Sequence, residues 1–123
     1  MKRIFFDPTG QILNMGGPYI GKLFIDGNEL VGNYLVDNFI VDNSSQMLFV
    51  VRYIDSGYFQ WQVKFKIQAI SLLNGNTCFS KRSFKAICLV EIAGGMISFF
   101  EVFCEGNKQV LKNISFTEEY FRP

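Results

Sequence analysis

The chain of 123 residues contains no histidine. Histidine is the commonest general base and the commonest side-chain ligand of transition metals, so its absence excludes Ser-His-Asp and Cys-His catalysis. The glycines form no G-x-x-x-x-G-K phosphate loop, and the acidic residues do not follow the D-x-D-x-D-G order of a calcium loop. The sequence therefore predicts a protein that is not an enzyme and that binds neither a metal nor a cofactor.

Cysteine is also scarce, with three copies at positions 78, 88 and 104. They show no C-x-x-C spacing, which disfavours a zinc site. An odd number of cysteines suits a reducing compartment, where thiols pack as small hydrophobic groups. Cys78 lies near Lys81 and Arg82, which could activate a thiolate, but packing is the simpler interpretation.

Long apolar runs are missing as well. No segment approaches the roughly 20 apolar residues of a membrane-spanning helix. The basic start at Lys2 and Arg3 is followed by only three apolar residues before Asp7, which is too few for a secretory signal. We therefore expect a cytoplasmic protein without a membrane partner.

Short turn signals divide the chain, and the runs between them are rich in Val, Ile, Phe and Tyr. Evenly spaced runs of this kind are typical of a β-sandwich or barrel. We predict one all-β domain over residues 1–123, an antiparallel meander of about 8–10 short strands. The turn signals lie at residues 16–18, 26–28, 42–45, 55–57, 74–76, 94–95 and 106–107.

Residues 60–68 alternate strictly between polar and apolar side chains, which predicts a half-buried strand. Trp61, Val63, Phe65 and Ile67 are expected to face the core. The polar residues Gln62, Lys64, Lys66 and Gln68 are expected on the other face.

Three turns predict the register of the later strands, if each is a two-residue hairpin loop. The Gly94-Gly95 loop pairs Ile92 with Ile97, Val90 with Phe99, Cys88 with Glu101, and Ala86 with Phe103. The Gly106-Asn107 loop pairs Phe103 with Val110, Glu101 with Lys112, Phe99 with Ile114, and Ile97 with Phe116. The Asn74-Gly75 loop pairs Trp61 with Cys88, Val63 with Ala86, and Phe65 with Phe84.

The third register has a cost, because it places Lys64 opposite Lys85, and like charges directly opposite are destabilising. A bulge or a three-residue loop would relieve this conflict.

The second face of the last strands is partly apolar, with Ile87, Leu89, Phe100, Val102 and Leu111. Such a face must be covered by the N-terminal half of the chain or by a partner.

A small β domain without catalytic groups, rich in Phe, Ile, Asn and Lys, resembles the bacterial immunity proteins that neutralise a cognate toxin. The resemblance concerns general character and rests on no motif. It implies a binding protein that occludes the active site of a toxin domain. The first 59 residues carry four basic and six acidic side chains, and an acidic surface suits a basic toxin. The residues predicted to bind the partner are Asp26, Glu29, Asp37, Asp42, Asp55, Leu89 and Phe100.

Two other functions remain open. A closed barrel could carry a small apolar ligand, with Glu101 and Lys112 as polar groups in its lumen. A basic face could bind single-stranded nucleic acid weakly, although a solvated surface is the simpler interpretation. The residues of that face are Lys64, Lys66, Lys81, Arg82 and Lys85.

Overall fold

The computed structural model describes residues 2–11, 18–54, 64–107, 110–117 and 121–122. These residues form ten strands and no helix, so none of the described segments could cross a membrane as a helix. Every strand pair is antiparallel, which confirms the predicted all-β meander. The strands are β1 (Ile4–Gln11), β2 (Tyr19–Ile25), β3 (Asn28–Asp42), β4 (Met47–Ile54), β5 (Lys64–Ser71), β6 (Thr77–Ser80), β7 (Cys88–Ala93), β8 (Met96–Phe100), β9 (Leu111–Ser115) and β10 (Phe121–Arg122).

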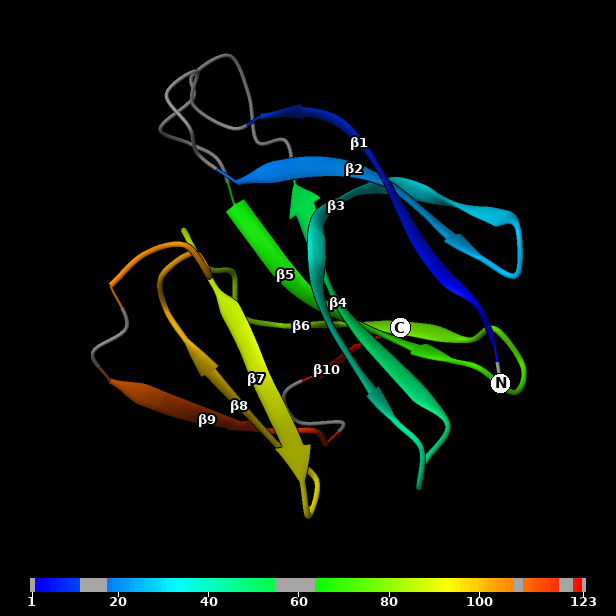
Figure 1. Cartoon of the computed structure of the whole chain (residues 1–123). Coiled ribbons are helices and arrows are strands. Elements are labelled where there is room, and N and C mark those ends of the chain that lie inside the picture. Colours follow the sequence, from blue (N-terminus) through cyan, green and yellow to red (C-terminus); the bar gives the residue numbers. More distant parts are fainter. Residues whose placement is uncertain (1, 12–17, 55–63, 108–109, 118–120, 123) are drawn as a thin grey trace.

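The strands form two sheets, one of seven strands in the order β1-β2-β3-β4-β5-β6-β10 and one of three in the order β7-β8-β9. In Figure 1 the small sheet, coloured yellow to orange, lies beside the β3–β5 part of the large sheet. The arrangement is sandwich-like, with separate sheets, and the predicted choice between sandwich and barrel is resolved in favour of the sandwich.

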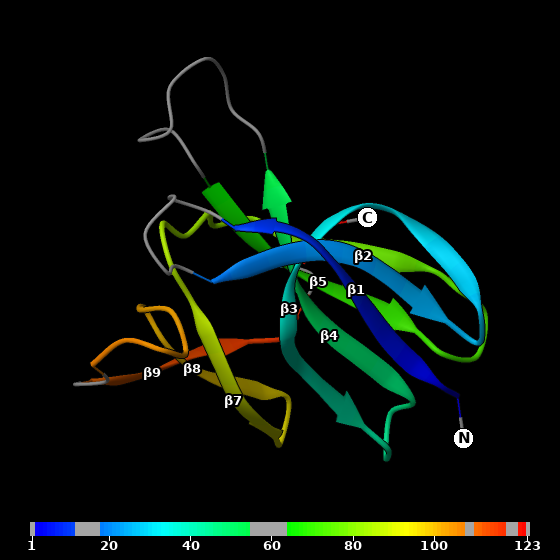
Figure 2. The same cartoon turned by 45° about the horizontal axis from the view of Figure 1, so that its top comes forward.

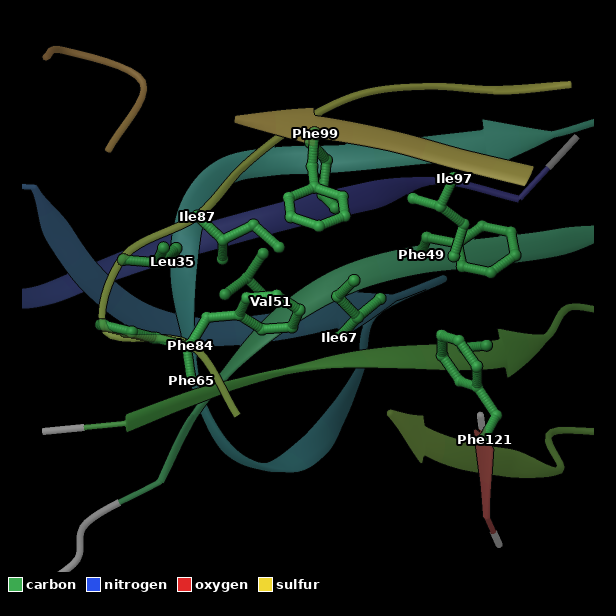
Figure 3. Close-up of a cluster of buried hydrophobic side chains, with 12 residues drawn as sticks. Leu35, Phe49, Val51, Phe65, Ile67, Phe84, Ile87, Ile97, Phe99 and Phe121 are labelled. Carbon is green, nitrogen blue, oxygen red and sulfur yellow. The ribbon is translucent and has the colours of Figure 1, made fainter. Parts of the chain in front are cut away.

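The main core lies between the two sheets. Phe49 and Phe65 of the large sheet are fully buried against Ile97 and Phe99 of β8, and Ile87 joins them from the segment before β7 (Figure 3). Fully burying a side chain of this size stabilises the fold by about 1.5–3 kcal/mol. The large sheet therefore covers the Ile97–Phe99 face of the small sheet. Of the predicted second apolar face, Ile87 and Leu89 also join this core, whereas Phe100 and Leu111 do not.

A second cluster lies on the opposite face of the large sheet. It joins Phe6 and Leu23 of the first two strands to Leu48, Val50 and Ile70 of β4 and β5. These strands are not neighbours in the sheet order, so the sheet must fold over itself to bring them together. The sheet bends within β3. The pairing of β3 with β4 shifts between Tyr34 and Phe39, and Asp37 in that stretch has a φ of 61°. Figure 2 shows β1 and β2 side by side above this bent strand.

The Gly94-Gly95 hairpin is confirmed, together with the predicted pair Ile92–Ile97. Both glycines have positive φ, 59° and 76°. A two-residue loop of type I′ needs this conformation at both central positions, and glycine adopts it without steric cost.

Beyond that pair the predicted register of β7 is wrong, because a bulge lies at Val90. Leu89 pairs with Phe99 and Cys88 with Phe100, so Val90–Phe99, Cys88–Glu101 and Ala86–Phe103 do not form. The extra residue of the bulge exchanges the faces on which the preceding side chains lie. Val90 is therefore 44% exposed, whereas Ile87 and Leu89 enter the core. Leu89 is therefore not available on the surface, contrary to its place in the predicted partner site.

The predicted Gly106-Asn107 hairpin is also wrong. β8 ends at Phe100, and Ile97 pairs with Ile114 and Phe99 with Lys112, a shift of two positions that keeps each side chain on its predicted face. The predicted pairs Phe103–Val110, Phe99–Ile114 and Ile97–Phe116 are absent from this ladder. Residues 101–107 lie outside the sheet, and within this segment Cys104 forms a disulfide with Cys88.

The Phe65–Phe84 pair is confirmed as an isolated bridge with hydrogen bonds of 2.8 Å in both directions. Between that bridge and the turn at residues 74–76, the observed register of β5 and β6 differs from the predicted one by two residues, because Gln68 pairs with Phe79. The shift is absorbed where the Ser80 hydroxyl accepts a hydrogen bond from the Ile67 amide. Phe65 and Ile67 face the core as predicted, and Gln68 lies on the other face but is buried. Residues 60–63, including Trp61 and Val63, lie outside the described residues.

Candidate functional site

The first two strands present an aromatic pair on the outer side of their hairpin. Phe6 and Leu23 point into the second cluster, so by strand alternation their neighbours Phe5 and Phe24 point outward. These two are cross-strand partners with ring centroids 6.0 Å apart. Phe5 is 57% exposed, although burial of a phenylalanine is the normal outcome.

Around this pair the surface forms an open hollow of about 710 Å³. We call this surface the hairpin face; its lining residues are Arg3, Phe5, Asp7, Phe24, Asp26 and Gly27. Aromatic side chains surrounded by charged residues are typical of a surface that binds another protein.

Asp26 shapes one end of the hairpin face. It has a φ of 51° in the β2–β3 turn, and its carboxylate accepts a hydrogen bond of 2.7 Å from the Arg3 amide. Its other oxygen lies 3.8 Å from the Lys2 ammonium. Glu29 is nearby, opposite Phe24 on the next strand.

The other predicted acidic residues are not part of this face. Asp37 lies at the bend of β3, and Asp42 lies at the far end of the same strand. The Asp42 carboxylate accepts hydrogen bonds from the hydroxyls of Ser45 and Ser44, which lower its pKa. Asp55 lies outside the described residues. The structure therefore spreads the predicted acidic residues along β3 and the turn before it and does not gather them on one surface.

A second exposed apolar surface covers the outer side of the small sheet. Phe100 and Val102 line a hollow of about 360 Å³ together with Glu101, Asn107, Val110 and Lys112. Val110 is 64% exposed. Of the two apolar residues predicted for partner binding, Phe100 reaches this surface, and Leu89 does not.

Glu101 binds two cations at the edge of this hollow. Its Oε1 accepts a hydrogen bond of 3.1 Å from Lys112 Nζ and is also paired with the Arg82 guanidinium. The Glu101–Lys112 contact predicted from the sequence is thus present, although the two residues are not direct strand partners. Partial burial raises the pKa of Glu101, but the hydrogen bonds from Lys112 and Arg82 outweigh this, so the pKa lies below its usual value.

These contacts predict a pH dependence. The folded pKa of Glu101 is depressed, so its ion pairs stabilise the fold at pH values above the unfolded pKa of about 4.3. This stabilisation is lost as the pH falls through the folded pKa. The pairs are partly exposed, so we expect a loss of at most about 1 kcal/mol. In urea unfolding, E101Q should lose stability at pH 7 and show a smaller decline than the native chain from pH 5 to pH 3. Equal declines would contradict the assignment.

The predicted basic face is divided by the structure. Lys64 and Lys66 flank the inward-pointing Phe65 on β5, so both lie on the opposite side of the sheet. Lys85 is exposed and lies outside the strands, in the bend between the Phe65–Phe84 bridge and β7. Lys81 is exposed directly after β6. Arg82 belongs elsewhere, because it pairs with Glu101 and its guanidinium lies 4.7 Å from the Phe84 ring centroid.

Arg52 joins the remaining lysines, and the sequence analysis missed it. It is the direct cross-strand partner of Lys66. Its neighbours in the segment Val50-Val51-Arg52-Tyr53 read as an ordinary apolar strand, and only the β4–β5 register reveals that it stands beside lysines.

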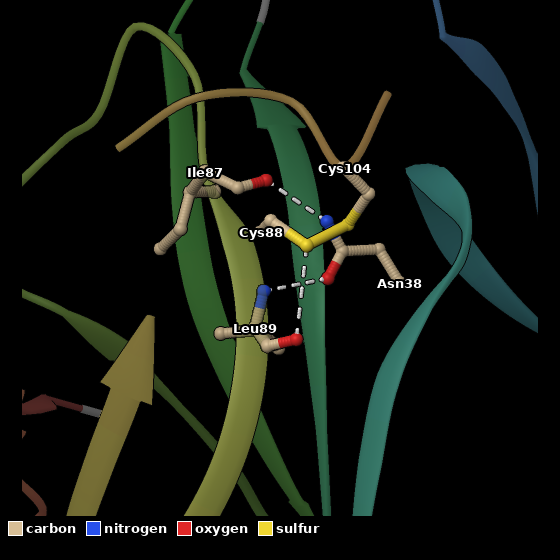
Figure 4. Close-up of a disulfide and its surroundings, with 5 residues drawn as sticks. All are labelled: Asn38, Ile87, Cys88, Leu89 and Cys104. Carbon is tan, nitrogen blue, oxygen red and sulfur yellow. Dashed lines mark hydrogen bonds between the residues drawn. A yellow bond between two sulfur atoms is a disulfide. The ribbon is translucent and has the colours of Figure 1, made fainter. Parts of the chain in front are cut away.

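The cysteine interpretation is wrong for two of the three residues. Cys88 and Cys104 form a disulfide with Cα atoms 4.9 Å apart. Beside it the buried Asn38 side chain donates to the Ile87 carbonyl (2.9 Å) and accepts from the Leu89 amide (3.0 Å) (Figure 4). The Asn38 side chain thereby satisfies two backbone groups at the free edge of β7, as the backbone of a neighbouring strand would.

Cys78 is the free cysteine, and it is half-buried against the main core. Burial raises the pKa of its thiol, which is the opposite of what an activated nucleophile needs. The described residues contain no group of three or more Cys, Asp or Glu side chains placed to hold a metal ion.

No family model, curated protein or solved structure matches the chain.

Proposed function

We propose that this chain is a binding protein and that it docks a protein partner through the hairpin face. The observation that carries the proposal is the exposed Phe5, whose ring lies tilted against that of Phe24 in an open hollow with charged residues around it. Exposed aromatic groups of this kind commonly supply most of the binding energy of an interface.

Within this proposal, the specific partner that the sequence suggests is a toxin domain, with the chain acting as its immunity protein. Asp26 and Glu29 support it, because they lie beside Phe24 and could meet basic groups of such a partner. Such charges mainly speed association, while the aromatic pair would hold the complex.

The disulfide bears on where the domain works. Disulfides persist in oxidising compartments and are rare in the cytosol. The Cys88–Cys104 bond therefore supports a site of action outside the reducing cytoplasm, in contrast to the location expected from the sequence.

The alternative of an apolar-ligand carrier has less support. Glu101 and Lys112, the polar groups assigned to its lumen, bind each other at the edge of the small sheet. The space between the sheets is occupied by the buried aromatic and aliphatic side chains of the main core.

Truncation of Phe5 tests the proposal. In a pull-down with the co-expressed product of the neighbouring reading frame, Phe5→Ala should weaken the complex about 30-fold, which corresponds to about 2 kcal/mol for an aromatic anchor. Affinity would be measured by titration calorimetry with the purified partner.

Val110→Ala is the matched control, because it removes an exposed apolar side chain from the other hollow. Its affinity should equal that of the native chain. If Val110→Ala weakens binding and Phe5→Ala does not, the partner uses the small sheet and the hairpin face is the wrong site. If no complex forms with the native chain, the toxin-immunity version fails.

A further inference from the structure

Three residues form a row across the large sheet, on the side opposite the main core. Tyr34 of β3 is the direct partner of Arg52 on β4, and Arg52 is the direct partner of Lys66 on β5. Direct partners have Cα atoms about 4.5–5.5 Å apart. Arg52 and Lys66 can therefore both reach one small group placed above them.

We propose that this row is a binding site for an oxyanion of the phosphate type. It uses none of the residues of the hairpin face, so it is independent of the proposed protein-binding function. The ligand could be a small phosphate compound or the backbone of a single-stranded nucleic acid, which share the same recognised group.

The Arg52 side chain is held in place from several sides. Its guanidinium carbon lies 5.7 Å from the ring centroids of both Tyr34 and Phe79. Gly32, with a φ of 113°, lies against it, and a Cβ at that position would approach Nε to 2.4 Å. A guanidinium fixed in this way loses little entropy when it binds an anion.

The charge of Arg52 is not neutralised by the residues around it. Burial raises the pKa of the Tyr34 hydroxyl, so this group stays a neutral phenol, and it donates its proton to the Val31 carbonyl at 2.8 Å. In the described part of the chain, the ion pairs involve Lys2, Arg82 and Lys112 and not Arg52 or Lys66.

Like charges standing opposite each other in a sheet are destabilising. Arg52 faces Lys66, and Lys64 lies two residues from Lys66 on the same face of β5. A bound anion would remove this repulsion, which gives the ligand a reason to bind here.

Buried polar atoms around the row lack partners within the described residues. Arg52 Nε is one of them, and its N–H is a donor that an oxyanion can accept from. Gln68 Oε1 is another, but it is an acceptor and an oxyanion would not satisfy it. An unpaired buried polar group costs about 1–3 kcal/mol, and such groups in native proteins often mark functional sites. The unpaired Arg52 donor supports a site that is incomplete without its ligand.

The test measures binding of pyrophosphate and of a short oligothymidylate to the native chain at low ionic strength. We expect pyrophosphate to bind with a Kd of about 1 mM or below and to raise Tm. An oligonucleotide that binds at least tenfold more tightly, with a steep salt dependence, would identify nucleic acid as the source of the phosphate. Equal or weaker oligonucleotide binding would identify a small compound.

Two variants locate the site. Arg52→Gln and Lys66→Gln should each weaken pyrophosphate binding about tenfold, the effect expected for loss of one charged hydrogen bond. Lys66 is half-buried and its side chain lies on the face opposite the main core, so Lys66→Gln should fold even if Arg52→Gln does not. Lys22→Gln on β2 is the control for a change of one charge elsewhere and should bind normally. Absence of binding by the native chain, or unchanged binding by Lys66→Gln, would overturn the proposal.

Discussion

Reduction of the Cys88–Cys104 disulfide is expected to lower the free energy of unfolding by about 3 kcal/mol. The bond closes a loop with a sequence separation of 16 residues, and a loop of about that length gains roughly this amount from restriction of the unfolded chain. In urea, with a slope of about 1–3 kcal/mol/M, the midpoint should fall by about 1 M or more. The measurement compares unfolding with and without reductant.

The double variant C88A/C104A should reproduce the reduced chain and should no longer respond to reductant. Cys78→Ala is the matched control, because it removes the free thiol and leaves the disulfide intact; it should keep its full response. Thiol titration of the native chain should detect one accessible or denaturant-exposed thiol before reduction. Identical midpoints with and without reductant would contradict the prediction.

Part of the strand register next to the disulfide could not be predicted. A strand pattern allowed β8 to continue through Phe103 into a Gly106-Asn107 turn, but β8 ends at Phe100 and the segment that follows it is joined to Cys88 by the disulfide. With an odd number of cysteines and no characteristic spacing, the sequence contains no signal that pairs these two residues. The face of each β8 and β9 residue was nonetheless correct, because the error was an even number of residues.

The bulge at Val90 was hidden for a different reason. Leu89 and Val90 are both apolar, so an inverted alternation looks as plausible as the correct one, and burial could not be assigned from polarity. Where polarity does alternate, as around Phe65 and Ile67, the prediction of the buried face is confirmed. Gly94-Gly95 was equally informative, since its turn type is determined by local backbone conformation.

The candidate site was harder to predict than the fold. Phe5 lies in a short apolar run that gives no sign of which ring remains outside, and exposure depends on how β1 and β2 pack on the second cluster. Of the acidic residues expected in turns, Asp26 lies in one and Asp42 directly precedes another, but Asp37 lies inside β3. Positions so far apart along one strand do not form one surface. Charge composition alone therefore did not locate a binding face.

Asn38→Ala is expected to cost about 2–4 kcal/mol, although it removes only one small side chain. The 6% exposed amide makes two hydrogen bonds to the edge of β7. Without it, the Leu89 N–H and the Ile87 carbonyl would be left buried and unpaired, and each such group costs about 1–3 kcal/mol. Urea unfolding measures the loss, and Asn28→Ala, an exposed asparagine at the start of the same strand, should change stability by less than about 0.5 kcal/mol.

Asn38→Asp separates this hydrogen-bonding role from simple filling of space. An aspartate keeps the acceptor for the Leu89 N–H but, when ionised, turns an oxygen toward the Ile87 carbonyl in a buried place, which raises its folded pKa above the unfolded value of about 3.9. A group with a raised folded pKa stabilises fully below the unfolded pKa, and this contribution is lost as the pH rises through the folded pKa. The gap between N38D and the native chain should therefore be large at pH 7 and close toward pH 4, where the protonated carboxyl can donate to Ile87. A gap that does not change with pH would mean that β7 is held by the core and the disulfide, with Asn38 only occupying volume.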